Sequence, residues 1–199
     1  FNAASHELKT PVTILKGQLT GMLEGVGVYQ NRDKYLLRSL QVTGRMENLV
    51  QEMLTISRME AGAAAMKQEP VELSALLEEQ LKLDAGLLEQ RSQHLDKKLT
   101  PGITTIGDAV LLGKVLGNLI SNASLYSPDG AGIRIWCGWQ DGRPAVTVEN
   151  TEAHIGEDAL PHLYEAFYRE ECSRNRASGG SGLGLYLVKI CLLYTSDAA

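Results

Sequence analysis

The sequence predicts an α+β protein built in two parts, a helical hairpin followed by a sandwich of helices on a sheet. Two long stretches, 2–24 and 32–60, repeat apolar residues every three or four positions, as amphipathic helices do. After residue 70, shorter stretches of strand-like composition alternate with helical ones. We therefore expect a hairpin over residues 1–62, a linker over 63–70 and a second domain over 71–190.

The two N-terminal helices are expected to pair and then to dimerise. The Gly25-Val26-Gly27 break leaves a short connection, which favours an antiparallel hairpin. Pro11 has no amide hydrogen, so we expect a bend near the start of the first helix. One hairpin cannot bury both apolar stripes, and we predict a homodimeric four-helix bundle through residues 1–62. The stripes are Leu8, Val12, Leu15, Leu19, Met22 and Leu23, and then Leu36, Leu37, Leu40, Met46, Leu49, Val50, Met53, Leu54 and Ile56.

In the second part we expect one sheet covered by helices. The predicted strands are Val71–Leu73, His94–Leu99, Thr104–Ile106, Ile133–Trp139 and Ala145–Val148, the last two joined by the turn signal Asp141-Gly142. The predicted helices run from the cap Ser74 to Gln90, from the cap Asp108 to Ser124, from Glu157 to Tyr168 and from Gly182 to Ile190. A polar, glycine-rich loop over Ser173–Ser181 is expected to be mobile.

Composition excludes several classes of function. The 199 residues carry a net charge of −5, and nothing suggests the basic face that nucleic acid requires. The three cysteines are far apart and form no CxxC pair, so neither a disulfide framework nor a zinc site is indicated. No apolar run approaches the ~20 residues that cross a bilayer. Because the chain opens at Phe1 without methionine, we expect a fragment whose parent carries any membrane segment upstream.

The most informative stretch is Ser5 to Pro11. His6 can act as a nucleophile near neutral pH, and the neighbouring carboxylate of Glu7 can accept a hydrogen bond from its ring. Thr10 lies four residues on, on the same helical face, where it can orient a water or a phosphoryl oxygen. A lone histidine would be an ordinary surface residue, but the whole string with its proline favours chemistry.

A pair of amides lies on the predicted helix after Asp108. Asn118 and Asn122 are four residues apart, so their side chains share a face. A carboxamide oxygen suits Mg²⁺, which keeps most of its waters and phosphate ligands. A polar stripe on an amphipathic helix explains the pair equally well.

A glycine-rich turn, Gly180 to Leu185, follows the loop and opens a helix. Glycines permit close backbone approach, and a helix N-terminus attracts phosphate. The turn lacks the Lys-Ser/Thr of a P-loop and the strand–helix–strand setting of a Rossmann fold, and a simple helix cap is the alternative. Just before the loop, the aromatics of Tyr164 to Arg169 are expected to pack its root, with Arg169 able to contact a polyphosphate.

In this order, the motifs resemble the transmitter region of a sensor histidine kinase of a two-component system, over nearly the whole chain to Ile190. Ser5 to Pro11 resembles the H box and Asn118 to Asn122 the N box. Tyr164 to Arg169 resembles the F box and Gly180 to Leu185 the G2 box. The runs Ser5–Gln18 and Leu183–Lys189 further resemble the vancomycin-resistance (VanS-like) sensor kinases.

The resemblance implies a dimeric phosphoacceptor hairpin (DHp-like) and a Bergerat-type (GHKL) α/β-sandwich ATP-binding domain. His6 would take the γ-phosphoryl of ATP, Glu7 would act as its base, and Thr10 would assist dephosphorylation of a response regulator. The implied cofactors are ATP and Mg²⁺, with Asn122 as the metal ligand. The implied ATP-binding residues are Asn118, Asn122, Tyr126, Asn150, Ile155, Arg169, Gly180, Gly182, Leu183 and Gly184. The implied partners are a second copy and a receiver domain, in the cytoplasmic part of a bacterial membrane sensor.

Two departures from the family pattern concern nucleotide binding. The G1 box normally reads Asp-x-Gly-x-Gly-Ile, whereas this chain has Asn150 in place of the aspartate, lacks both glycines and keeps Ile155. The amide oxygen of Asn150 can still accept a hydrogen bond from adenine, less strongly than a carboxylate does. A lysine common after the N box is Leu125 here, and Arg169, Arg174 or Arg176 could supply the missing charge.

The third departure is the C-terminal end. Residues 191–199 do not fit the expected helix continuation and match a translation of transposase-adapter DNA used in sequencing libraries. We therefore expect the native sequence to end near Ile190, short of strands that complete the ATP-binding sheet in the family. Such a truncation exposes strand edges, and a domain stable by only ~5–15 kcal/mol could then stay unfolded. Enzymatic activity is thus expected of the longer parent.

Two functions of different classes remain open from the sequence. The first is an autokinase that phosphorylates His6 and passes the phosphate to a response regulator, with a possible phosphatase activity. The second is a dimeric scaffold with weakened catalysis, which the changes at Asn150 and Leu125 favour. A chaperone or topoisomerase ATPase shares the implied ATP fold, but the hairpin that carries His6 argues against it.

Overall fold

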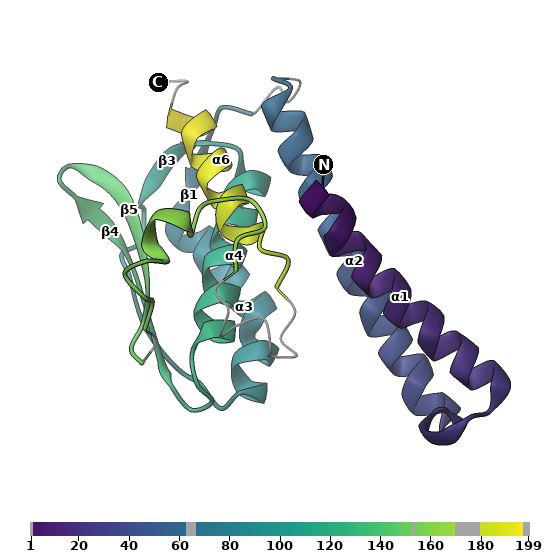
Figure 1. Ribbon diagram of the computed structural model, residues 1–199. Coiled ribbons are helices and arrows are strands. Elements are labelled where there is room, and N and C mark those ends of the chain that lie inside the picture. Colours follow the sequence, from purple (N-terminus) through teal and green to yellow (C-terminus); the bar gives the residue numbers. More distant parts are fainter. Residues whose placement is uncertain (1, 63–66, 153, 170–179, 197–199) are drawn as a thin grey trace. The chain divides into compact units, whose positions relative to one another are not determined.

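The computed structural model describes residues 2–62, 67–152, 154–169 and 180–196 (Figure 1). Its contacts divide the chain into two compact units, Phe1–Arg58 and Met59–Ala199, and each is described by itself. Most of the predicted loop 173–181, together with Arg174 and Arg176, lies outside the described residues. Among the described residues, no helix combines the length and apolarity needed to cross a bilayer.

The first unit is the predicted hairpin. Helix α1 (Asn2–Glu24) and helix α2 (Arg32–Glu60) have the expected bounds and are joined by a short 3-10 helix, Gly27–Gln30. Gly25 has a φ of 63°, a left-handed conformation that glycine adopts without strain. The Tyr29 ring packs onto Gly21, where a Cβ would lie 2.4 Å from the ring. These small residues let the chain reverse tightly.

The hairpin alone buries little of its apolar surface. Ser39 donates a hydrogen bond of 2.9 Å to Oε1 of Gln18 across the two helices. Leu23, Leu37 and Leu40 remain 84%, 64% and 69% exposed. Within residues 2–58, the buried side chains are Met22, Tyr35, Ser39, Leu49 and Ile56. A single hairpin therefore leaves a broad apolar face uncovered.

The second unit contains two groups of strands. In the first, β1 (Glu69–Glu72) pairs antiparallel with β3 (Thr104–Gly107). In the second, β4 (Gly132–Gln140) lies between β2 (His94–Leu99), to which it is parallel, and β5 (Arg143–Asn150), to which it is antiparallel. The expectation of one sheet is thus wrong for the described residues: after the Pro101-Gly102 turn the chain leaves β2, and the Ile103 carbonyl accepts the Leu73 amide instead.

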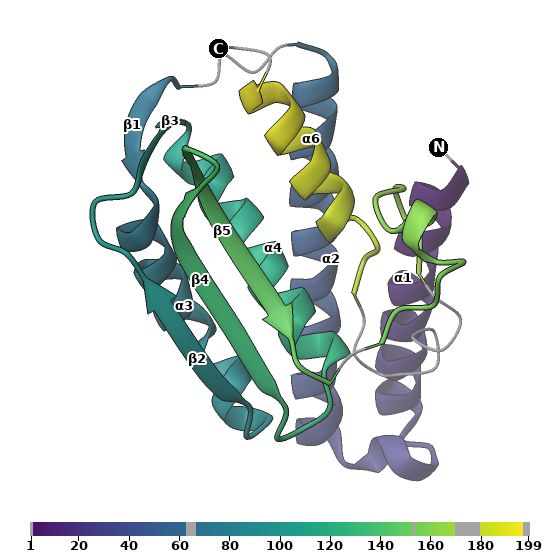
Figure 2. The ribbon, with the colours of Figure 1, turned by 90° about the vertical axis from the view of Figure 1, so that its left-hand side faces the viewer.

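Helices form a layer on one face of the three-stranded sheet (Figure 2). Helices α3 (Leu73–Gln90) and α4 (Ala109–Tyr126) lie behind the strands, and α6 (Gly184–Ser196) packs beside α4. The core between the layers contains Leu77, Ile120, Ile133, Ile135 and Cys137, each exposed by 1% or less. This packing fixes α3 and α4 relative to the sheet, and α6 is placed by its contacts with α4.

Helix caps were predicted correctly at one site and wrongly at another. Asp108 caps α4 by accepting the amides of Val110 (2.9 Å) and Leu111 (3.2 Å), as expected. Ser74 does not cap α3. Glu72 does so, because its longer side chain reaches the Ala75 amide at 3.2 Å and also accepts the hydroxyl of Ser74.

Local sequence predicted the β4–β5 turn but not the region around 157–168. Asp141 and Gly142 both have positive φ, 51° and 74°, which suits the tight hairpin. The predicted helix Glu157–Tyr168 is wrong, since only the 3-10 helix Leu160–His162 forms. Pro161 removes one amide donor, and the Phe167 amide bonds to the Gly182 carbonyl at 2.9 Å rather than to a helical partner.

The last helix also differs from its expected bounds. Gly182 has a φ of 71°, so α6 begins two residues later, at Gly184. The helix continues past Ile190 to Ser196, contrary to the expectation that residues from 191 onward do not extend it. Cys191 is part of the packed face and is 1% exposed.

Candidate functional site

His6 lies in the second turn of α1 with its side chain exposed. The Thr10 hydroxyl donates a hydrogen bond of 3.3 Å to the His6 carbonyl, one turn back along the helix. Thr10 and His6 thus share a face, as predicted. Adjacent helical residues point about 100° apart, and within residues 2–62 no hydrogen bond joins Glu7 to the His6 ring. The imidazole is therefore open to an incoming group.

In the second unit, α4 and α6 meet at the predicted amide pair. Asn118 and Asn122 are half-buried on the same face of α4. The backbone of Gly184, the first residue of α6, lies against them: a Cβ there would lie 2.8 Å from Asn118 Oδ1 and 3.8 Å from Asn122 Nδ2. The structure therefore brings together residues that are more than sixty positions apart in the sequence and that two separate motifs predicted.

The turn before α6 needs glycine for two reasons. Gly182 adopts the left-handed region, and a Cβ there would lie 2.8 Å from the Phe167 carbonyl carbon. The Phe167 amide and the Gly182 carbonyl are hydrogen-bonded, so the two predicted motifs are joined through their backbones. Next to this contact, Ser181 Oγ accepts the Leu183 amide at 3.1 Å, and Leu183 is 2% exposed. The turn that opens α6 is thus firmly anchored.

Asn150, at the end of β5, is tied to α4. Its Nδ2 donates to the Ala123 carbonyl at 3.2 Å, and the Ser127 hydroxyl donates to the same carbonyl at 2.6 Å. An aspartate at position 150 could not make the first bond, because a carboxylate has no donor. One N–H of the Asn150 amide is therefore used within the protein.

For the remaining predicted residues, the structure shows one contact and the exposure of the others. A Cβ at Gly180 would lie 3.7 Å from the Tyr126 hydroxyl, so these two residues are neighbours. Ile155 is 45% exposed, and Arg169 is half-buried two residues after Phe167. Leu125 is half-buried on α4, where the family pattern has a lysine.

A buried polar network at the C-terminal end of α4 was not predicted from the sequence. Gln93 Nε2 donates to the Ser124 carbonyl (2.9 Å) and to the Pro128 carbonyl (3.2 Å), while Ser124 Oγ donates to Gln93 Oε1 (2.6 Å). Arg91 adds bonds to the carbonyls of Ser124 and Ser127. The network satisfies helix-end carbonyls and so fixes the turn that carries Asn122 and Ala123. Apart from Gln93 Oε1, its acceptors are backbone carbonyls, which carry no signal in the sequence.

The amide oxygens of Asn118 and Asn122 are a ligand set that fits a metal ion held mainly by a nucleotide. Among the described residues, no group of three or more His, Cys, Asp or Glu could hold a metal ion. Amide oxygens beside a glycine backbone suit Mg²⁺ that also binds phosphate oxygens. At Gly182 and Gly184 a Cβ would lie 2.8 Å from Phe167 and Asn118, so only glycine lets the backbone come this close to them.

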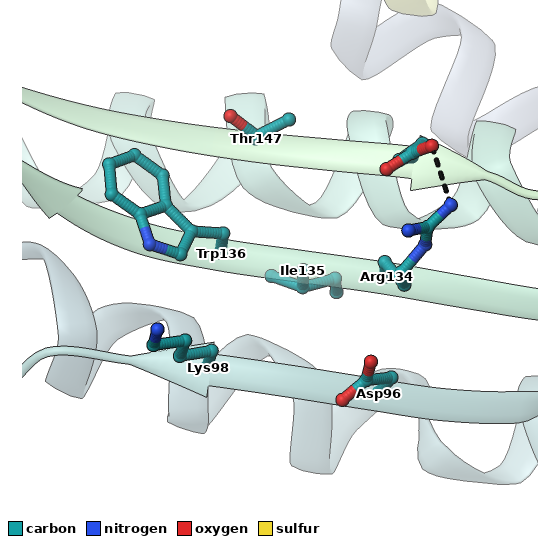
Figure 3. A pocket seen from close by; sticks show the side chains of 7 residues that line it. Asp96, Lys98, Arg134, Ile135, Trp136 and Thr147 are labelled. Atoms are coloured by element: carbon teal, nitrogen blue, oxygen red, sulfur yellow. Dashed lines mark hydrogen bonds and ion pairs between the residues drawn. The ribbon is translucent and has the colours of Figure 1, made fainter. Parts of the chain in front are cut away.

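A shallow hollow of about 150 Å³ lies on the outer face of the three-stranded sheet (Figure 3). Its lining side chains alternate in charge, and Arg134 forms an ion pair of 2.8 Å with Glu149. The hollow is lined by Asp96, Lys98, Arg134, Ile135, Trp136, Thr147 and Glu149. None of the predicted site residues is among them, so the hollow is separate from the site on α4 and α6.

Two family models match the chain in the order that the motifs predicted. Residues 1–62 match the His Kinase A (phospho-acceptor) domain. Residues 107–196 match the family described as histidine kinase-, DNA gyrase B-, and HSP90-like ATPase. The first match covers α1 and α2, and the second contains α4, α6 and Asn150.

Curated relatives are sensor kinases. The sensor protein VanSB of Enterococcus faecalis is 34% identical over 95% of this chain and 42% of its own length. The signal transduction histidine-protein kinase BaeS of Escherichia coli is 36% identical over 94% of this chain and 39% of its own. The chain thus spans about two fifths of these relatives. Their similar identities establish the family and leave the subfamily open.

A solved structure matches both parts of the fold. The Acinetobacter baumannii histidine kinase AdeS is 26% identical, with a TM-score of 0.77 over 94% of this chain and 86% of that one. The order of elements, the amide pair against Gly184, the two family models and the relatives all agree. The chain therefore belongs to the sensor histidine kinases of two-component systems.

Proposed function

We propose that the parent protein is a histidine autokinase that transfers the γ-phosphoryl group of ATP to His6 and then to a response regulator. The observation that carries the proposal is the close contact of the Gly184 backbone with Asn118 and Asn122, which brings two amide side chains to the start of α6. At this position the N-terminus of α6 and its backbone amides favour negative charge. Residues 1–62 act as the phosphoacceptor hairpin and the ATP-binding domain begins near Val71.

The proposed reaction is an in-line displacement at phosphorus. A lone pair of a His6 ring nitrogen forms the N–P bond, the bond from the γ-phosphorus to the bridging oxygen breaks, and ADP leaves. The ring proton passes to Glu7 as base. Most of the acceleration in phosphoryl transfer comes from positioning and charge stabilisation. The exposure of His6 supports its role, since the acceptor must reach a phosphate held in another part of the protein.

Asn122, with Asn118 beside it, is the proposed holder of Mg²⁺. When bound, the ion would neutralise charge on the phosphate oxygens. Gly180, Gly182, Leu183 and Gly184 would place backbone beside the phosphates, and Arg169 would add positive charge. Tyr126, next to Gly180, would line the nucleotide site.

Asn150 is the residue proposed to recognise adenine. The hydrogen bond from Asn150 Nδ2 to the Ala123 carbonyl supports a fixed orientation of the amide. In this orientation Oδ1 would accept a hydrogen bond from the adenine amino group. Ile155, 45% exposed, would pack on the base.

The proposed partners follow from the hairpin and the family. The exposed leucines of α1 and α2 would be buried in a homodimer. The receiver domain of a response regulator would take the phosphate from His6, and Thr10 would assist its later hydrolysis. The chain would lie on the cytoplasmic side of a membrane-anchored bacterial sensor.

A weakened scaffold is the second candidate. The observation in its favour is the half-buried Leu125, which removes a positive charge that the family usually provides near the phosphates. Such a protein would dimerise and bind a regulator without efficient phosphorylation.

A phosphotransfer assay tests the proposal. The full-length parent is incubated with γ-labelled ATP, freed of nucleotide and mixed with a receiver domain encoded beside it. Loss of label from the kinase with gain on the receiver supports the autokinase. A folded protein that binds the receiver but takes up no label supports the scaffold.

A further inference from the structure

The last turn of α2 is attached to α6. The Tyr186 hydroxyl donates a hydrogen bond of 2.6 Å to Glu60 Oε1, and the Cys191 thiol approaches the Met59 sulfur at 3.8 Å. Met59 and Glu60 end α2, yet both belong to the compact unit that contains α6. These contacts are therefore internal to the second unit.

The two contacts between α2 and α6 differ in burial and in chemistry. Met59 is 2% exposed and Cys191 1%, so the side chains are well packed. Burial raises the pKa of the Cys191 thiol to about 11, which keeps it neutral in this contact at pH 7. The bond between Tyr186 and Glu60 joins a hydroxyl to a carboxylate at an exposed position, and such charge-assisted bonds are typically short.

The contact lies next to the nucleotide site along α6. Gly184 is two residues before Tyr186, and both are in the first turn of the helix. On its other side α6 packs against α4, with Leu187 and Val188 buried. Because Gly184 and Tyr186 are two residues apart in one helix, a movement of α6 at Tyr186 also moves Gly184 relative to Asn118.

We propose that Glu60 and Tyr186 are positioning residues for ATP, whose hydrogen bond holds α6 so that Gly184 stays against Asn118. The inference rests on the proposed function, because it assigns the phosphates of ATP to the start of α6 beside Asn118 and Asn122. It extends the nucleotide-binding unit back to the last turn of α2. A displacement of that turn then changes the affinity for ATP without any change at the residues that touch the nucleotide.

The test uses the full-length parent and the variants Tyr186→Phe and Glu60→Ala. Each is expected to raise the KM for ATP about three- to tenfold and to leave kcat at saturating ATP within about twofold. The double variant should be no worse than either single one, because both remove the same bond. Glu60→Gln retains an acceptor oxygen and should stay closer to the wild-type KM. Glu79→Ala, an exposed glutamate on α3, is the matched control.

The dissociation constant of a non-hydrolysable ATP analogue, measured by calorimetry on the same variants, gives a second readout. Equal KM and equal dissociation constants in wild type, Tyr186→Phe and Glu60→Ala overturn the inference, as does a lower Tm with unchanged affinity. A wild type that binds the analogue but leaves His6 unlabelled refutes the proposed function instead, and the binding comparison still decides the inference.

Discussion

The backbone of Gly184 lies so close to the carboxamide of Asn118 that a Cβ would come within 2.8 Å of Oδ1. A Gly184→Ala substitution must therefore displace Asn118 or the start of α6. We expect the affinity for ATP to fall at least tenfold, since the residues proposed to hold phosphate are displaced. Isothermal titration of the full-length protein with ATP measures this change.

Gly86→Ala provides the control for that experiment. Gly86 lies within α3, and a Cβ there meets nothing within 4 Å. Alanine is the better helix former by about 1 kcal/mol, so Gly86→Ala should raise Tm and leave ATP affinity unchanged. Wild-type affinity in Gly184→Ala would show that phosphate does not bind at the start of α6.

Asn150 should determine the preference for adenine over guanine. Asn150→Leu removes both the bond to the Ala123 carbonyl and the acceptor for the adenine amino group. We expect ATP affinity to fall about tenfold or more and the weak GTP affinity to change little, because guanine has no amino donor at that position. Competition titrations with both nucleotides measure the ratio, with Thr147→Val on the outer face of the same strand as control. An equal loss for ATP and GTP would contradict the assignment.

Asp84 should make stability depend on pH. Burial raises the pKa of its carboxyl above the ordinary 3.8, against the opposing effect of a hydrogen bond from Gln80. The pKa of Asp84 is higher in the folded than in the unfolded protein, so folding favours the protonated carboxyl. The contribution of Asp84 to the free energy of unfolding is therefore complete below about pH 3.8 and is lost as the pH rises through the folded pKa. Asp84→Asn should therefore have a higher Tm than wild type at pH 7.

The gain from Asp84→Asn should shrink as the pH falls toward 4. Thermal unfolding of both proteins at several pH values between 4 and 7 measures the difference. A pH-independent gain, or a lower Tm at pH 7, would contradict the assigned cause.

The apolar face of the hairpin should govern dimerisation. Leu40 is 69% exposed on α2, and Leu40→Glu would place a charge within the proposed bundle. We expect this variant to become monomeric by light scattering at micromolar concentration. Leu83 is 73% exposed on α3, outside the hairpin, and Leu83→Glu should leave the dimer intact. Dissociation by both changes, or by neither, would argue against residues 1–62 as the interface.

Local signals in the sequence were enough to predict the elements that depend on neighbouring residues. Apolar spacing gave the bounds of α1 and α2, and Asp108 and the Asp141-Gly142 pair were predicted to cap a helix and to turn a hairpin. These features depend on contacts a few residues apart.

Features set by distant contacts could not be predicted in this way. The 157–168 region looks helical in isolation, but the Phe167 amide is bonded to Gly182. The pairing of β3 with β1 likewise depends on a bond between Ile103 and Leu73. In the candidate site, the motifs predicted the side chains, whereas the Ala123 carbonyl that orients Asn150 is a backbone atom with no sequence signal.

The central claim is that phosphate passes from ATP held at Asn122 and Gly184 to His6. The most direct measurement is incubation of the full-length parent with γ-labelled ATP, followed by analysis of the label on wild type, His6→Gln, Gly184→Ala and Gly86→Ala. We predict acid-labile, alkali-stable label on wild type and Gly86→Ala, none on His6→Gln, and little on Gly184→Ala. Undiminished label on His6→Gln would contradict the account, because the phosphate would then have another destination.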